Sequence, residues 1–130
     1  LTGATLSGVT TGGLVGTPAA LPTDWQLTNG YLIGPEANLT NADLSDQNLD
    51  GAMLQSANLS YAYLQGASLR GVDLTGINGN NATFLTADLT NARLIYASLN
   101  GASLSRAILA GVSSGSISGT PATCRPPGTW

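Results

Sequence analysis

Small and apolar residues recur every five positions over residues 37–111, and polar residues fill the places between them. The stretch divides into fifteen pentads, of which thirteen carry Leu at the third place. Phe84 fills a fourteenth third place and Gly79 the remaining one, while Ala stands first in twelve pentads. The other three first places hold Gln47, Val72 and Ile77. One column of leucines and one of alanines therefore run through the whole stretch.

A period of five excludes an amphipathic helix and a plain strand. On an α-helix, five residues advance the side chain by about 500°, so the leucines would wind around the axis and form no stripe. On a flat strand the side-chain period is two, so leucines an odd number apart would alternate between faces. A short extended piece whose small residue and Leu point to one side, followed by a corner, satisfies the pattern. We expect the chain to coil with Ala and Leu inside.

The segments Ala37-Asn38-Leu39, Ala42-Asp43-Leu44 and Ala87-Asp88-Leu89 carry the pattern A(N/D)LxX. This run resembles the bacterial pentapeptide-repeat family. The resemblance implies an all-β fold, a right-handed quadrilateral β-helix (solenoid) with four pentapeptides per coil. Such a solenoid is stabilised by contacts between neighbouring coils, with no single large globular core.

Outward residues twenty positions apart provide a check on the number of pentads per coil. A coil of twenty residues would stack Asn38, Asn58 and Asn78 as an amide ladder. It would also place Asp50 next to Arg70, and Asp73 next to Arg93. With three pentads per coil, Asp73 would instead lie beside Asp88. The charges therefore favour four pentads.

The core is expected to include Leu39, Leu59, Phe84 and Leu99. Gly79 removes the Leu that should stack between Leu59 and Leu99, and Ile77 enlarges the first place of the same pentad. Because a cavity of Leu size costs about 3–5 kcal/mol, we predict that Ile77 fills the gap. A Gly-rich ligand loop is the functional alternative, and Asn78-Gly79 also suits a bulge or tight bend.

Gln47 occupies a small inward place, where a buried amide without partners costs about 1–3 kcal/mol. It lies in the first regular coil, next to the irregular segment that precedes the pentads. We therefore expect its side chain to bond backbone near residues 28–36.

The pentad frame weakens towards the N-terminus. Residues 1–11 form a partial pentapeptide coil in which the inward places hold Leu1, Leu6, Val9 and, as a polar substitute, Thr11. Residues 12–36 are rich in Gly and Pro and form an irregular coil or insertion. One interpretation is a β-hairpin that turns at Asn29-Gly30, a dipeptide suited to a type I′ turn. The other makes Leu27 and Leu32 two faces of a coil, and we favour it because Gly30 stands two places before Leu32.

The C-terminal segment repeats the N-terminal one. Residues 4–19 align without gaps on residues 107–122, with nine of sixteen identical, and both copies run on to a Trp. Residues 112–130 are therefore a Gly/Pro-rich tail or the start of a next repeat block. We infer that the chain is a module, or a piece of a tandem array.

Length and composition limit the functions that the chain can have. A chain of 130 residues is one domain by size, and charged residues make up 8% of it. The net charge is −3, with no Lys and no His, so no basic patch could neutralise nucleic-acid phosphates. No apolar run approaches the roughly 18 residues of a membrane span. Without His, Lys or an activated Ser or Cys, we expect no enzyme activity, no cofactor and no small-molecule substrate.

A few residues are candidates for chemistry or contacts. The carboxylates of Asp43, Asp46 and Asp50 could form a weak Ca²⁺ site, although a solvated surface is favoured. Cys124 stands alone, so it is a free thiol or half of a bridge to another chain. Together with Trp25 and Trp130, it is a candidate for intermolecular contact. Sequons at Asn38, Asn58 and Asn81 follow from the repeat itself. The outward apolar residues are Met53, Tyr61, Tyr63, Leu85, Ile95 and Tyr96.

Two functions remain open. The first is a structural or protein-interaction module of a secreted or surface tandem-repeat protein, which self-assembles by end-to-end stacking of open coil ends. A cytoplasmic location is the alternative. The second is a partner-binding inhibitor resembling the family's DNA-mimicking topoisomerase-resistance proteins. That resemblance implies a strongly acidic surface. The net charge of −3 favours the first function.

Overall fold

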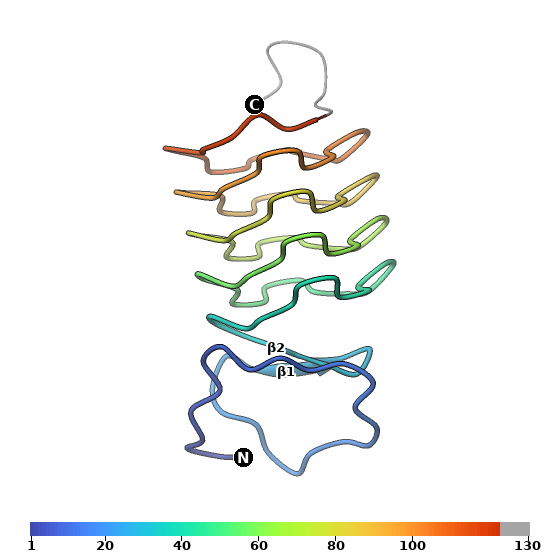
Figure 1. Ribbon diagram of the computed structural model, residues 1–130, viewed down its shortest axis with the longest axis vertical. Helices are drawn as coiled ribbons and strands as arrows, with labels where there is room; N and C mark the ends of the chain where they lie inside the picture. The colour runs from blue at the N-terminus through green and yellow to red at the C-terminus, as the bar shows by residue number, and fades with distance from the viewer. Residues whose placement is uncertain (123–130) are drawn as a thin grey trace.

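The protein forms a column of stacked coils, shown in Figure 1 with the N-terminus at the bottom. The structure, a computed structural model, describes residues 1–122. Parallel β-bridges join residues twenty positions apart, from Asn38 with Asn58 up to Ser98 with Ser118. Each coil therefore pairs with the next along its backbone, and the side chains of the Ala and Leu columns fill the interior. Among the described residues, no helix is long and apolar enough to cross a membrane.

A tight turn closes each pentad and makes the corner that the period of five requires. In the first regular pentad the Ala42 N–H donates to the Leu39 carbonyl at 3.0 Å, and Asn41 between them has a φ of 59°. A positive φ at the third residue of a turn is typical of type II, which favours Gly or Asn there. Every fifth place from Glu36 to Ser116 has a positive φ. The corner is thus the same throughout the column.

The polar residue before each Leu holds the extended part of the pentad in place. The Asn38 Oδ1 accepts from the Thr40 N–H at 3.2 Å and from the Thr40 hydroxyl at 2.7 Å. Asn58 makes the same two bonds with Ser60, at 3.0 and 2.6 Å. Side-chain oxygens of this kind satisfy backbone donors near turns. Asn38, Asn58 and Asn78 stack as expected, because their backbones form bridges between coils. Their Oδ1 atoms, however, accept bonds within their own coil and not along the stack.

The core consists of the first and third places of the pentads. Leu39, Leu59, Phe84 and Leu99 each have no more than 1% of their surface exposed. Gly79 is also buried, and its amide donates to the Ser98 carbonyl at 2.8 Å as in a regular coil. No bulge forms at Asn78-Gly79, because Asn78 also keeps its bridge to Ser98.

Ile77 occupies the space next to Gly79. A Cβ built on Gly79 would lie 3.2 Å from the Ile77 Cδ1 and 2.9 Å from the Leu99 Cδ2. Ile77 itself is 1% exposed. The larger first-place residue thus takes up volume that the missing Leu leaves.

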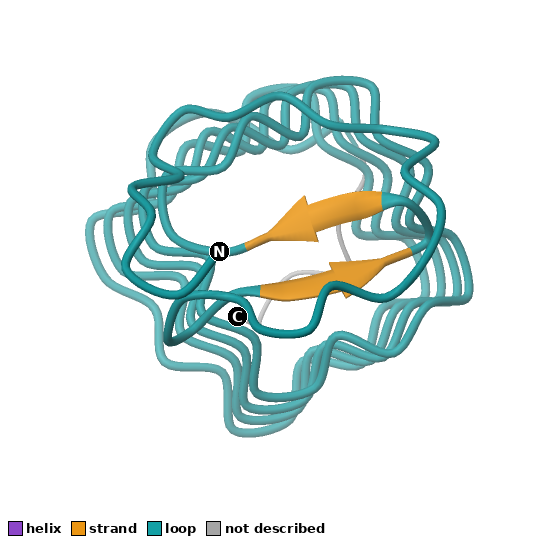
Figure 2. Cartoon of the chain, turned by 90° about the horizontal axis from the view of Figure 1, so that it is seen from below, coloured by secondary structure: helices purple, strands orange, loops and turns teal. Residues whose placement is uncertain are grey.

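A β-hairpin precedes the regular coils, so the favoured interpretation of residues 27–32 as two coil faces is wrong. Strand β1 (Gln26–Thr28) pairs antiparallel with β2 (Tyr31–Ile33), and Leu27 lies opposite Leu32. Asn29 and Gly30 have φ of 47° and 78°, and positive values at both central residues define the type I′ turn. Figure 2 shows the hairpin crossing the inside of the column when it is viewed from below.

Residues 1–11 form the lowest turn of the column. The Gly8 N–H donates to the Glu36 carbonyl, and the Asn38 N–H to the Val9 carbonyl, both at 2.9 Å. Leu6 and Val9 are half-buried as expected. Leu1 lines a cavity together with Leu27 and Leu32 of the hairpin, although 58% of its surface is exposed.

Candidate functional site: the C-terminal end of the column

The acidic residues of the first regular coil do not form a metal site. Within residues 1–122, no group of three or more His, Cys, Asp or Glu residues could hold a metal ion. The Asp43 Oδ1 accepts from the Ser45 hydroxyl at 2.7 Å, and this bond lowers the pKa of Asp43. The Asp50 Oδ1 accepts from the Ser68 hydroxyl at 2.6 Å and from the Arg70 amide at 2.9 Å. Asp43 therefore bonds within its own pentad, while Asp50 joins its coil to the next.

Two arginines form ion pairs on the outside of the column. Arg93 lies 3.5 Å from the Asp73 carboxylate, the neighbour expected for coils of twenty residues. Arg70 stacks on Asp50 through its backbone, but its Nε pairs with the Asp88 Oδ2 at 2.6 Å in the next coil. Bonds from the Thr90 hydroxyl and amide, together with the bond from Arg70, lower the pKa of Asp88 to about 2. Arg70 therefore joins three coils.

The amide of Gln47 does not reach the hairpin, which corrects the expectation for this residue. Its Nε2 donates to the Ser45 carbonyl at 3.1 Å, and the side chain is half-buried. Within residues 1–122, the bridges of this part of the first regular coil lead only upward, as from Asn48 to Ser68. Gln47 therefore faces an incompletely covered edge of the column, and water can reach it.

The three residues predicted for intermolecular contact are placed differently. Trp25 is half-buried against the core, and its indole covers Gly34, where a Cβ would collide with the ring. Trp25 thus packs within the chain. Cys124 and Trp130 lie outside the described residues.

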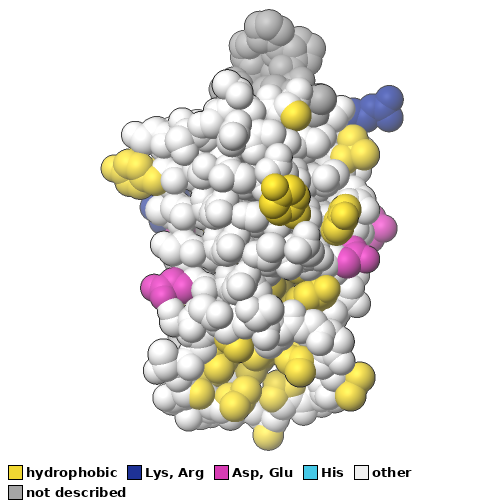
Figure 3. All heavy atoms as spheres, in the orientation of Figure 1, with side chains coloured by type: hydrophobic (Ala, Val, Ile, Leu, Met, Phe, Trp, Pro, Cys, Tyr) yellow, Lys and Arg dark blue, Asp and Glu magenta, His cyan; other side chains and the backbone are white. Residues whose placement is uncertain are grey.

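Figure 3 shows outward apolar side chains scattered over the upper coils and gathered at the lower, N-terminal end of the column. Tyr61, Tyr63 and Tyr96 are 55%, 50% and 67% exposed. Tyr61 and Tyr96 stand at corners of the coil, each with a positive φ, while Tyr63 pairs with Thr83 along a face. Scattered exposed apolar residues are normal, so they do not define a binding surface.

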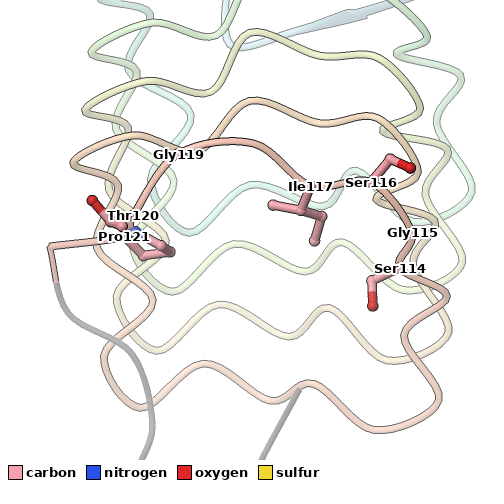
Figure 4. A pocket seen from close by; sticks show the side chains of 7 residues that line it. All are labelled: Ser114, Gly115, Ser116, Ile117, Gly119, Thr120 and Pro121. Carbon is pink, nitrogen blue, oxygen red and sulfur yellow. The ribbon is translucent and has the colours of Figure 1, made fainter.

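The column has a hollow at its C-terminal end. A cavity of about 520 Å³ is lined by Ser114, Gly115, Ser116, Ile117, Gly119, Thr120 and Pro121. Figure 4 shows these residues along the last described turn, with the Ile117 side chain between the two sides of the coil. Leu109, Val112 and Ile117 pack against the core but are only partly buried, whereas interior leucines lower in the column are fully covered.

The backbone edge at this end also lacks partners. In regular coils the amide at the fifth place donates to the coil above, as from Gly71 to the Thr90 carbonyl at 2.8 Å. The Gly111 amide, at the same place in the last pentad, has no acceptor among residues 1–122. An apolar hollow beside unpaired strand edges can accept a further β element. The sequence analysis expected open coil ends that stack, but it did not identify the hollow around Ile117.

Comparison with known proteins agrees with the geometry. The sequence profile of pentapeptide repeats matches residues 37–76 and 87–113 with eight copies. No curated protein is significantly similar to the chain.

Solved structures show the same repeat. Rfr23, a pentapeptide repeat protein from the cyanobacterium Cyanothece 51142, is 37% identical over 66% of this chain, with a TM-score of 0.65. The pentapeptide repeat protein alr5209 from Nostoc PCC 7120 is 38% identical over 58% of the chain, with a TM-score of 0.43. The chain spans 59% and 62% of the lengths of these two proteins. The repeated pentads, the coiled backbone, the family profile and the match to Rfr23 show that the chain belongs to the pentapeptide repeat family, whose members adopt a right-handed β-helix.

Proposed function

We propose that the protein is a structural and protein-interaction module that binds a further β element at the C-terminal end of its column. Pentapeptide repeat proteins are generally interaction or structural modules and are generally non-enzymatic. The observation that carries the proposal is the apolar hollow around Ile117, beside the Gly111 amide that has no acceptor among residues 1–122. Columns joined in this way would assemble end to end.

The sides of the column offer less to a partner than its end does. Asp73 and Asp88 are paired with Arg93 and Arg70, so these charges are compensated within the chain. Most polar groups before the leucines bond within their own pentad, as Asn38 does with Thr40. A partner would have to displace these bonds at a cost, whereas the end already has open groups.

The finer geometry of the coil is part of the proposal. We take each coil to be quadrilateral, with one pentad per side. The twenty-residue spacing of the bridges from Asn38 to Ser118 supports this, since twenty residues contain four pentads.

We further propose that the module belongs to a tandem-repeat protein that is secreted or exposed on the cell surface. The repeat of residues 4–19 at 107–122 and the exterior of Ser, Thr and Asn without Lys support this. Fractionation of source cells with an antibody to the module tests the location. Finding the antigen only in the soluble cytoplasmic fraction would contradict it.

An inhibitor that mimics DNA has less support. Such a role needs a strongly acidic surface, whereas the net charge here is −3 and Arg70 and Arg93 stand between the carboxylates. A gyrase supercoiling assay with and without the protein tests this alternative, and we expect no inhibition.

Sedimentation velocity over rising concentrations of the full chain tests the docking end. We expect the sedimentation coefficient to increase with concentration, and Ile117→Asp to abolish the increase because a charge then lies in the hollow. Tyr96→Asp is the control, since Tyr96 is 67% exposed at a corner on the outside of the column. A wild-type protein that stays monomeric at every concentration would refute end-to-end docking.

A further inference from the structure

The two end segments related in sequence also share their backbone conformation. Residues at matching places, 103 apart, both have positive φ: Gly8 and Gly111 at 70° and 67°, Gly16 and Gly119 at 91° and 86°. Gly13 has a φ of 68°, and Ser116, its equivalent, adopts 53° although it carries a side chain. Residues 4–19 and 107–122 are therefore two copies of one structural piece.

Each copy is paired on a different side. Residues 4–19 are bound only from above: Thr10 pairs with Asn38. Residues 107–122 are bound from below, where Ser113 pairs with Arg93 and Ser118 with Ser98. If one such segment had the lower partners of residues 107–122 and the upper partners of residues 4–19, the column would continue through it without a break.

The groups that hold the hairpin over the N-terminal copy recur in the C-terminal copy. The Leu32 amide donates to the Thr11 hydroxyl at 2.7 Å, and the Leu14 amide to the Gly30 carbonyl at 3.2 Å. Ser114 stands in the place of Thr11 and keeps the hydroxyl, while Ile117 replaces Leu14 with an aliphatic side chain of the same size.

The two cavities of the column match in the same way. Leu14, Gly16, Thr17 and Pro18 line a cavity of about 290 Å³, together with Leu27 and Leu32 of the hairpin. Their equivalents Ile117, Gly119, Thr120 and Pro121 line the larger C-terminal hollow. Leu27 and Leu32 of the hairpin thus lie against the equivalents of the residues that line the C-terminal hollow.

Resting on the proposed function, we propose that the occupant of the C-terminal hollow is a second copy of this chain, joined by segment exchange. Residues 107–122 of one copy take the place of residues 4–19 beneath the hairpin of the second copy. Ser113 then pairs with Asn38 of the second copy, and the Ser114 hydroxyl accepts from its Leu32 amide. The two columns run on as one, in the register that Thr10 and Asn38 have within a single chain.

The N-terminal segment is held weakly enough to be exchanged. One β-bridge, between Thr10 and Asn38, and a few separate hydrogen bonds such as that of the Gly8 amide join residues 1–22 to the rest of the described column. Each regular coil has a bridge on every pentad. Weakly bonded terminal segments open at the lowest free energies in a protein. One contact is lost on exchange, because Ala110 replaces Ser7, whose hydroxyl bonds the Glu36 carboxylate.

Disulfide trapping in the full chain tests the register, with Cys124→Ser in every variant. The pair Asn38→Cys and Ser113→Cys should link copies into covalent dimers and longer chains on oxidation, because parallel bridge partners lie about 4.8 Å apart. Asn48→Cys with Ser113→Cys is the matched control and should not link. Thr10→Cys with Asn38→Cys should close within one chain, hold residues 4–19 in place and abolish concentration-dependent sedimentation.

The outcomes separate this inference from the proposed function. Trapping of the first pair, with loss of assembly in the closed variant, supports segment exchange. Assembly that persists in the closed variant, with no trapping of the first pair, overturns exchange while leaving end-to-end docking intact. Absence of both trapping and wild-type assembly overturns both.

Discussion

The Ile77 Cδ1 lies 3.2 Å from the point where a Cβ of Gly79 would stand. The Ile77 side chain therefore fills space that a Leu at position 79 would otherwise occupy. Ile77→Ala should therefore leave a cavity and lower the free energy of unfolding by about 2–5 kcal/mol. Val72→Ala at another enlarged first place should cost less, because Leu74 remains in its pentad. Denaturant unfolding measures both. Equal losses in the two variants would contradict the filling role.

The same pair predicts a rescue. Gly79→Leu alone should destabilise, because its side chain would meet the Leu99 Cδ2 and Ile77. The double variant Ile77→Ala with Gly79→Leu restores a regular pentad and should be more stable than either single variant. A double-mutant cycle measures the coupling, and simple additivity of the two changes would refute it.

Gln47→Ala should leave the hairpin unchanged. The Gln47 amide bonds the Ser45 carbonyl and touches water, so its loss should change stability by no more than about 1 kcal/mol. Hydrogen exchange of the Leu32 amide reports on the hairpin directly. Faster exchange in the variant would show that Gln47 supports the hairpin after all.

Much of the column could be predicted from the sequence, because each pentad repeats the same turn and buries the same two places. The Ala and Leu columns lie inside, and Ile77 and Gly79 compensate each other. The hairpin was one of two interpretations but not the favoured one, because Gly30 and Leu32 fit both. The cross-strand pairing of Leu27 with Leu32, a contact that spacing alone does not reveal, decided in favour of the hairpin.

Side-chain directions were also beyond the sequence. A spacing of twenty correctly placed Asp50 beside Arg70, but the guanidinium turns towards Asp88 in the next coil. Asp50 and Asp88 both neighbour Arg70 on one face of the column, and only the rotamer of Arg70 decides which carboxylate its guanidinium binds. The C-terminal hollow is lined by residues 114–121, which lie beyond the last pentad, so the pentad pattern does not predict it.

Gly30→Ala should destabilise the N-terminal end. The φ of Gly30 is 78°, and a Cβ there would lie 2.8 Å from the Gly13 amide nitrogen. Strain of this kind costs about 1–3 kcal/mol. Gly115→Ala is the control, since nothing lies within 4 Å of its Cβ position. Thermal unfolding should separate the two variants, and equal midpoints would contradict the hairpin turn.

Acid should destabilise the column partly through Asp88. Its pKa in the folded state is lowered from 3.8 to about 2. A lowered pKa stabilises the folded state at pH values above 3.8, and this contribution is lost as the pH falls from about 4 towards 2. Asp88→Asn should therefore flatten the dependence of Tm on pH in that window. Thr90→Val should raise the pKa of Asp88 in an NMR titration, and an unchanged pKa would exclude the Thr90 hydroxyl as a cause.

Electron microscopy of the full chain at raised concentration tests end-to-end docking most directly. In the proposed head-to-tail contact, the C-terminal end at Ile117 of one copy joins the N-terminal end of the next, so assembly adds length without width and propagates. We predict unbranched rods one column wide whose lengths are multiples of a single column. Isolated single columns, or sheets of columns packed side by side, would contradict the account.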